Sequence, residues 1–202
     1  MKKWLLIVVL PIFFAAQVGC GYQINSSGLT AGGLHTFNPA LNKTSVFMGD
    51  SITALWALPV HNAGVSGDPT STMVARFAAA VLGHGYVRVI ILGGTNDVLN
   101  FQLPTSQIIA NLDGMATTAK DAGIQPVMCL VPPIYATNKP DVNPQVQDLN
   151  QAISALARAK GYKVVDYNTP LLGHQEYFKD GIHPTVAGYA VMEDALARVV
   201  TN

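Results

Sequence analysis

Cysteine and charge are both scarce in this chain of 202 residues. It has only two cysteines, Cys20 and Cys129, which excludes a disulfide scaffold and a zinc site made of four cysteines. Charged residues make up 12% of the chain, and twelve basic residues balance twelve acidic ones. The basic excess of a nucleic-acid-binding protein is therefore missing, so we expect no nucleic-acid partner. A hydrophobic share of 50% also excludes a mainly disordered chain and predicts a globular domain.

A long hydrophobic run is missing too. The apolar stretch at residues 4–16 is shorter than the roughly 20 residues that cross a membrane. It follows two lysines, and this order is typical of a secretory signal peptide, which we expect at residues 1–19. The sequence predicts an extracytoplasmic protein.

Cys20 ends a segment, Gln17-Val18-Gly19-Cys20, that resembles a bacterial lipobox, although an aliphatic residue is usual where Gln17 stands. Lipidation of Cys20 would attach the protein to a membrane surface, and plain secretion is the alternative. Residues 20–43 are rich in Gly, Ser, Asn and Thr, and we expect them to form a tether. The folded domain is then expected at residues 44–202.

Short apolar runs alternate with helical patterns through the rest of the chain. Near-continuous apolar strands indicate burial on both faces, which is typical of parallel sheets in α/β proteins. Ligands bind beyond the carboxyl ends of such strands. The expected strands lie at or near residues 45–48, 62–63, 87–92, 126–131 and 163–166, and apolar residues at helical spacing fall at 108–119, 146–156 and 186–199. Cys129 falls inside a strand, where we expect a small buried side chain.

Two of the expected strands are followed by residues that could form a catalytic site. Gly49-Asp50-Ser51 would present a hydroxyl at the rim of the sheet, beside helix N–H groups that favour an anion. After the third strand, Asn96 could donate its amide to an oxyanion, and Asp97 is expected to hold the loop. Each motif alone is more often an ordinary turn than a site.

Gly67 and the segment Asp180–His183 supply the other candidate groups. Asp68 and Pro69 are typical of a helix cap and first helical residue, which would leave the Gly67 N–H free to donate. Asp180 and His183 are three residues apart and can face one cleft. A carboxylate bonded to one ring nitrogen stabilises an imidazolium, and the other nitrogen can then take a proton from a serine.

These motifs together resemble the SGNH hydrolase superfamily, also called GDSL esterases/lipases, over residues 44–200. The matching segments are Gly49-Asp50-Ser51, Asn62-Ala63-Gly64-Val65-Ser66-Gly67-Asp68, Gly94-Thr95-Asn96-Asp97 and Asp180-Gly181-Ile182-His183-Pro184. Ile52 replaces the leucine of the family name. The second and third segments look most like the branch related to platelet-activating-factor acetylhydrolase and lysophospholipase-like bacterial esterases. The resemblance implies a flavodoxin-like three-layer α/β/α sandwich with five parallel strands in the order 2-1-3-4-5.

The resemblance also implies a serine hydrolase of carboxylic esters that needs no metal or organic cofactor. Ser51 would be the nucleophile, His183 the base and Asp180 its partner. The Ser51 N–H, the Gly67 N–H and the Asn96 amide would form the oxyanion hole. The expected partner is a small-molecule, glycan or lipid ester, and the oligomeric state is left open.

Two other functions remain open at this stage. The same acyl-enzyme could pass its acyl group to a sugar, as an O-acetyltransferase does, or the chain could be a non-catalytic ligand-binding lipoprotein. Trp56 could line the acyl pocket, although packing against a helix is equally plausible. Ile134 and Tyr135 lie in a long Pro-containing loop at the same rim, which could shape substrate choice or merely connect two elements.

Overall fold

A computed structural model describes residues 35–201 of the chain. The expected signal peptide at residues 1–19 and the candidate lipidation residue Cys20 lie outside the described residues. No helix within residues 35–201 is both long and apolar enough to cross a membrane.

Five parallel strands form one sheet, in the order β2-β1-β3-β4-β5. This confirms the expected topology. In the register of the sheet, Gly49 at the end of β1 pairs with Gly64 of β2 and Leu92 of β3. These three strands therefore end together, and their following loops leave from the same edge. The strands are β1 (Ser45–Gly49), β2 (His61–Gly64), β3 (Arg88–Leu92), β4 (Gln125–Leu130) and β5 (Lys163–Asp166).

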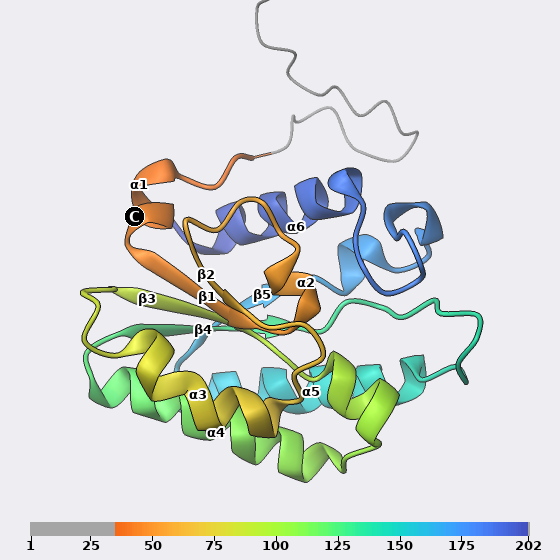
Figure 1. Cartoon of the computed structure of the whole chain (residues 1–202), viewed down its shortest axis with the longest axis horizontal. Coiled ribbons are helices and arrows are strands. Elements are labelled where there is room, and N and C mark those ends of the chain that lie inside the picture. Colours follow the sequence, from red (N-terminus) through yellow and green to blue (C-terminus); the bar gives the residue numbers. More distant parts are fainter. Residues whose placement is uncertain (1–34, 202) are drawn as a thin grey trace, which may run out of the picture. The chain divides into compact units, whose positions relative to one another are not determined.

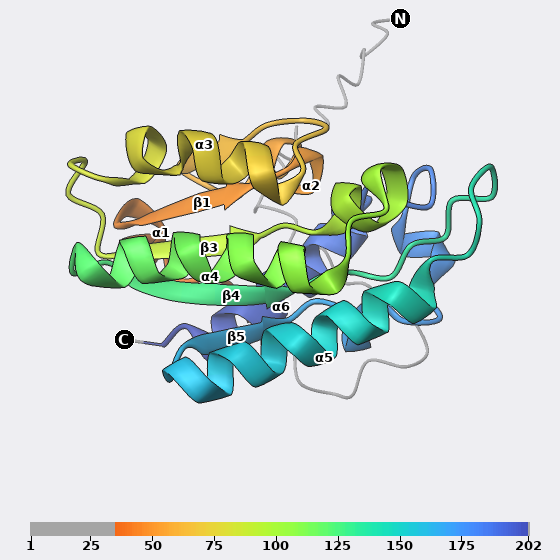
Figure 2. The same cartoon turned by 90° about the horizontal axis from the view of Figure 1, so that it is seen from below.

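Helices cover both faces of the sheet and complete the predicted three layers (Figure 1). One face carries α3 (Thr70–Val81), α4 (Thr105–Asp121) and α5 (Asn143–Lys160), which lie side by side in Figure 2. The other face carries α1 (Pro39–Lys43) and α6 (Val186–Val199). Each interface holds its own cluster of buried apolar side chains, as a sheet buried on both faces requires. Cys129 is buried in the α6 cluster, as expected for a small apolar residue.

Short elements fill the connections at the carboxyl edge of the sheet. A single turn, α2 (Ser51–Ala54), follows β1 directly. A π-helical turn, η1 (Asp97–Phe101), follows β3 and ends at Gln102, whose φ of 50° is left-handed. Two 3₁₀ turns, η2 (Thr169–Leu171) and η3 (Gln175–Tyr177), lie between β5 and α6.

Packed structure begins earlier than the expected boundary at residue 44. Phe37 is buried and meets the ring of Phe47 edge to face, with ring centroids 6.1 Å apart. The short helix α1 follows, with the Asn38 side chain accepting a hydrogen bond from the Ala40 N–H. The polar composition of residues 20–43 predicts a tether. Phe37 and the α1 residues nevertheless lie in the folded domain, because Phe37 packs on Phe47 and the Asn42 Nδ2 donates to the Leu58 carbonyl at 2.7 Å.

Candidate active site

Three side chains form a hydrogen-bonded chain at the carboxyl edge of the sheet. The Ser51 Oγ lies 2.8 Å from the His183 Nε2, and the His183 Nδ1 lies 2.7 Å from the Asp180 Oδ2. An ionised carboxylate can only accept, so the imidazole Nδ1 carries a proton and the Nε2 is free to accept from the hydroxyl. The fold thus brings together the nucleophile, base and carboxylate that the sequence singled out.

The turn after β1 places the Ser51 hydroxyl at this edge. The Asp50 side chain caps α2 by accepting from the Ile52 N–H at 2.9 Å, which makes Ser51 the first helical residue. Gly49 allows the tight packing beneath, because a Cβ there would lie 2.1 Å from the Thr53 Oγ1. The strand-to-helix turn therefore aims the hydroxyl away from the core and toward His183.

Asp180 organises the loop that carries the imidazole. Its Oδ1 accepts from the Ile182 N–H at 3.0 Å and from the His183 N–H at 2.8 Å. Partial burial works to raise the pKa of Asp180, but the hydrogen bonds from His183 and Ile182 outweigh it and lower this pKa to about 2. Asp180 is therefore a carboxylate throughout the neutral range and favours a positive charge on the His183 ring.

Asn96 presents its amide nitrogen toward the loop that contains Gly67. Its Nδ2 donates to the Asp68 carbonyl at 3.2 Å and lies 3.5 Å from the Asp50 Oδ2. Its oxygen accepts from the Asn100 Nδ2 at 2.8 Å, so the orientation of the amide is fixed. Asn100 belongs to the π-helical turn η1, which the sequence did not predict.

Gly67 lies in the turn between β2 and α3 with a φ of 84°. It is exposed, and no described atom lies within 4 Å of the place where a Cβ would stand. A left-handed backbone favours glycine here, and the residue is exposed in the turn. The start of α3 differs from the prediction, because Pro69 takes the cap position and the Asp68 side chain makes no cap bond. The Asp68 carboxylate instead accepts from the Arg76 Nε at 2.6 Å.

Asp97 holds the loop after β3, as the sequence predicted. Its Oδ2 accepts a hydrogen bond from the Thr70 N–H at 2.9 Å. The start of α3 is therefore capped by a residue 27 positions further along the chain. Burial raises the pKa of Asp97, and the Thr70 hydrogen bonds act against this rise. The contact fixes the distance between the Gly67 turn and the loop of Asn96.

Asp50 is fully buried beside the candidate nucleophile. Burial raises the pKa of Asp50 to about 7, although the Ile52 N–H and the nearby His183 charge lower it. The negative charge of Asp97 adds to the rise. The sequence identified Asp50 only as part of a motif, because burial of a carboxyl depends on the layers around it.

The three residues expected near a substrate pocket have structural contacts. Trp56 is buried, and its ring stacks on that of Tyr189 in α6 with centroids 5.6 Å apart. Of the two roles considered for Trp56, lining the acyl pocket and packing against a helix, this contact corresponds to the second. Ile134 is buried among the residues under α4 and α5. Tyr135 is partly exposed, and its hydroxyl accepts from the Gly173 N–H at 2.6 Å and donates to the Leu171 carbonyl at 3.2 Å. Tyr135 thus connects the loop after β4 to the loop after β5.

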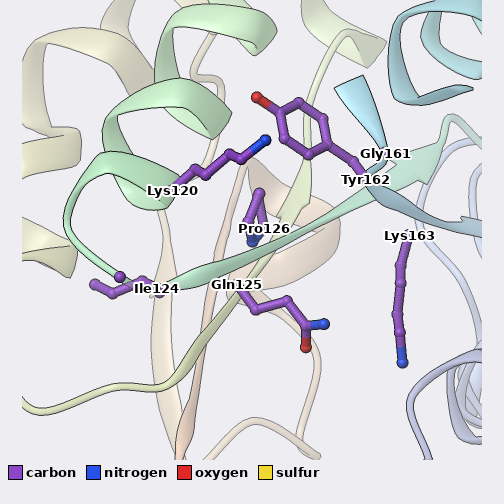
Figure 3. A pocket seen from close by; sticks show the side chains of 8 residues that line it. Lys120, Ile124, Gln125, Pro126, Gly161, Tyr162 and Lys163 are labelled. Carbon is purple, nitrogen blue, oxygen red and sulfur yellow. The ribbon is translucent and has the colours of Figure 1, made fainter. Parts of the chain in front are cut away.

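A separate hollow of about 310 Å³ lies at the opposite edge, where β4 and β5 begin. Figure 3 shows the Lys120 side chain extended toward the ring of Tyr162, with the Nζ 5.5 Å from the ring centroid. Lys163 donates to the Val199 carbonyl at 3.3 Å. None of the residues that line this hollow is a serine, cysteine, histidine or carboxylate. Within residues 35–201, no three side chains gather in a way that could hold a metal ion.

Known proteins share this fold and sequence pattern. The GDSL-like Lipase/Acylhydrolase family matches residues 29–191. A GDSL-like lipase from Bacteroides thetaiotaomicron is similar in structure, with a TM-score of 0.72 and 29% identity over 78% of this chain and 87% of that one. None of the curated proteins compared with the chain matches it.

Two more distant structures show the same fold. One is described as a platelet activating factor from Streptococcus pneumonia, with a TM-score of 0.69 and 24% identity over 77% of this chain and 82% of that one. The other is an acetylxylan esterase from Geobacillus stearothermophilus, with a TM-score of 0.65 and 17% identity over 78% of this chain and 96% of that one. The family match spans most of the described domain and includes every candidate site residue. The chain therefore belongs to the GDSL-like lipase/acylhydrolase family, a family of carboxylic ester hydrolases.

Proposed function

We propose that this protein hydrolyses carboxylic esters through an acyl-enzyme on Ser51. The observation that carries the proposal is the continuous hydrogen-bonded chain from the Ser51 hydroxyl through His183 to Asp180. A neutral serine hydroxyl is a weak nucleophile and needs such an adjacent base. The Asn96 amide and the Gly67 N–H lie on the neighbouring loops and are the proposed donors to an oxyanion. The Asn96 Nδ2 would exchange its 3.2 Å hydrogen bond to the Asp68 carbonyl for one to the oxyanion.

The mechanism follows from these positions. His183 takes the Ser51 proton at its Nε2 as the Ser51 oxygen attacks the ester carbonyl, and Asp180 stabilises the resulting imidazolium. The tetrahedral oxyanion is bound by the N–H groups of Ser51 and Gly67 and by the Asn96 Nδ2. His183 then gives its proton to the leaving alcohol, and the carbon–oxygen bond to that alcohol breaks. Water, deprotonated by His183, attacks the acyl-enzyme and releases the acid.

The test compares wild-type protein with the Ser51→Ala variant. Turnover of p-nitrophenyl esters of increasing acyl length is measured as kcat/KM, and labelling by an organophosphonate probe is followed in parallel. We expect Ser51→Ala to lose both turnover and labelling while its circular dichroism spectrum is unchanged. Full activity in this variant would end the proposal. A product analysis with a glycan acceptor present separates hydrolysis from acyl transfer.

The substrate proposed for this site is an ester with an apolar acyl group. A cleft of about 420 Å³ is lined in part by residues of η1 and of the loop that follows it. Its lining contains the apolar side chains of Val98, Leu99, Leu103 and Val142 and the polar side chains of Gln102, Thr105, Asp141 and Gln145. Exposed apolar side chains also lie on separate segments that follow the strands, namely Val65, Phe101 at the end of η1, Leu172 and Val186 at the start of α6. The apolar side chains of the cleft and of this edge are the support for an acyl chain as part of the substrate.

Leu103→Trp tests the assignment of this cleft, because the larger ring would shorten it. We expect the variant to lose kcat/KM for long acyl esters and to keep it for acetyl esters. Val87→Trp, at an exposed valine before β3, is the matched control and should leave the chain-length profile unchanged. An unaltered profile in Leu103→Trp would contradict the assignment.

We further propose that the enzyme acts outside the cytoplasm and is attached to a membrane surface through Cys20. The support is the order of two lysines, an apolar stretch and a lipobox-like segment in the sequence. Cys20→Ser should move the protein from the membrane fraction to the soluble fraction. A wild-type protein that is wholly soluble after cleavage of its signal peptide would exclude the anchor.

A further inference from the structure

One guanidinium group links three segments that surround the candidate site. Arg76, on α3, donates from its Nη2 to the Gly49 carbonyl at 2.8 Å and from its Nη1 to the Ala63 carbonyl at 2.7 Å. Its Nε donates to the Asp68 Oδ2 at 2.6 Å. The Nη1 also lies 3.5 Å from the Met48 sulfur. These contacts connect the end of β1, the end of β2 and the turn before α3.

Two of these partners are close in the chain to a group of the proposed mechanism. Gly49 is two residues before Ser51, and Asp68 directly follows Gly67. The Asp68 carbonyl also accepts the hydrogen bond from the Asn96 Nδ2. Asp68 is thus held by Arg76 through its carboxylate and by Asn96 through its carbonyl.

The contacts are those of a rigid, largely enclosed group. The Arg76 side chain is 24% exposed and that of Asp68 is 10% exposed. A guanidinium is planar and carries five donors in a fixed fork, so it can satisfy a carboxylate and two carbonyls at once. A lysine has one compact charge on a flexible stem and lacks the planar fork, so it does not reproduce this arrangement of donors.

We propose that Arg76 is a positioning residue that holds the nucleophile strand and the oxyanion-hole turn in register. The inference rests on the proposed function, because it assumes that Ser51 attacks and that Gly67 and Asn96 stabilise the oxyanion. A misplacement of about 1 Å in such an arrangement can cost about a hundredfold in rate. Arg76 touches neither the substrate nor the reacting atoms and acts through Gly49 and Asp68.

The test uses Arg76→Lys and Arg76→Met, with Asp68→Asn as a third variant. Arg158→Met is the matched control, since Arg158 is an exposed arginine on α5 at a distance from the site. For each variant, kcat, KM and the melting temperature are measured on p-nitrophenyl acetate. The rate of organophosphonate labelling of Ser51 is measured as well, because the phosphoryl oxygen of this probe occupies the oxyanion hole.

We expect Arg76→Lys to fold and to lose about a hundredfold in kcat, with KM changed by less than about threefold. Labelling should slow in parallel with kcat. Asp68→Asn should have a smaller effect in the same direction, because a neutral amide oxygen still accepts from the Arg76 Nε. Arg158→Met should behave as the wild type in all four measurements.

Other outcomes would overturn the proposal. If Arg76→Lys keeps kcat per folded molecule while its melting temperature falls, Arg76 serves the fold alone. If Arg76→Met does not fold, Arg76→Lys decides, and if neither folds the positioning role is wrong. Failure of the proposed function is a separate result, since Ser51→Ala would then remain active whatever the Arg76 variants do.

Discussion

The Ser51 Oγ and the His183 Nε2 lie 2.8 Å apart although 132 residues separate them in the chain. Ser51 is fixed by the end of β1 and the cap of α2, and His183 by the loop that precedes α6. The two side chains meet because β1 is an inner strand of the sheet and α6 packs over the face beside it. The packing that stabilises the layers is therefore also the packing that brings Ser51 and His183 together.

Replacing Asn96 by alanine should lower kcat by about 10²–10³ and leave KM nearly unchanged. The reason is that a donor to an oxyanion acts on the transition state, and loss of one such donor has about this cost. Steady-state kinetics on p-nitrophenyl acetate measures both constants. Gln107→Ala, at an exposed amide on α4, is the control and should have wild-type kinetics. A change confined to KM would argue against the oxyanion role.

Replacing Asp180 by asparagine should lower kcat and change the pH profile. An amide cannot stabilise the imidazolium, and in a buried triad this change costs about 10⁴ in kcat. The Asp180 side chain is 53% exposed, so water replaces part of its effect and we expect a smaller loss, about 10². Measurement of kcat and kcat/KM from pH 5 to 9 tests both the loss of rate and the change in the pH profile. Wild-type kcat at every pH would remove Asp180 from the mechanism.

Gly181→Ala should impair catalysis, whereas Gly173→Ala should not. Both glycines have a positive φ, 81° and 84°, so alanine strains the backbone at either position by about 1 kcal/mol or more. The two positions differ in the space around the added Cβ. At Gly181 the Cβ would lie 2.4 Å from the Tyr135 carbonyl carbon, whereas at Gly173 it would meet no atom of the described residues within 4 Å. The displaced loop carries His183. We expect a larger loss of stability on urea unfolding in Gly181→Ala than in Gly173→Ala, and a large loss of kcat in Gly181→Ala alone.

Equal kinetics in the two glycine variants would contradict this prediction. It would mean that the contact between Gly181 and Tyr135, in which the Tyr135 N–H also donates to the Gly181 carbonyl, does not position His183.

Asp50 should make the folded state less stable as the pH rises. Burial raises its pKa from 3.8 to about 7, so between these values the unfolded chain releases a proton that the folded protein keeps. The contribution of Asp50 to the free energy of unfolding is present at pH 4 and is lost as the pH rises to about 7. A shift of about three pKa units corresponds to a contribution of about 4 kcal/mol at most. Asp50→Asn is neutral at every pH and should therefore gain stability relative to wild type over this range.

Urea unfolding of both proteins at pH 4.5 and 7.5 measures this difference. Asp148→Asn, at an exposed carboxyl on α5, serves as the control. Parallel pH dependence in wild type and Asp50→Asn would show that Asp50 is ionised in the folded protein at low pH.

Local sequence patterns predicted the strands and the helices α4, α5 and α6 correctly because they record burial on one or both faces, but they gave no periodic pattern for α3. The run at residues 163–166 coincides with β5, and the pattern at residues 186–199 coincides with α6. The same reasoning misplaced the start of the domain, since Phe37 and α1 lie within the expected tether. It also assigned Asp68 to a helix cap, whereas the Arg76 guanidinium binds its carboxylate.

The sequence alone determined the alternation of strands and helices, and the chain order of Ser51, Gly67, Asn96 and His183 on the loops that follow the strands. These features are local, because side-chain periodicity and turn residues act over a few positions. Only the tertiary structure decided that Arg76 reaches Gly49, that Asn100 orients Asn96, and that Trp56 packs on Tyr189. Such contacts join distant parts of the chain, and they exist only once both faces of the sheet are covered.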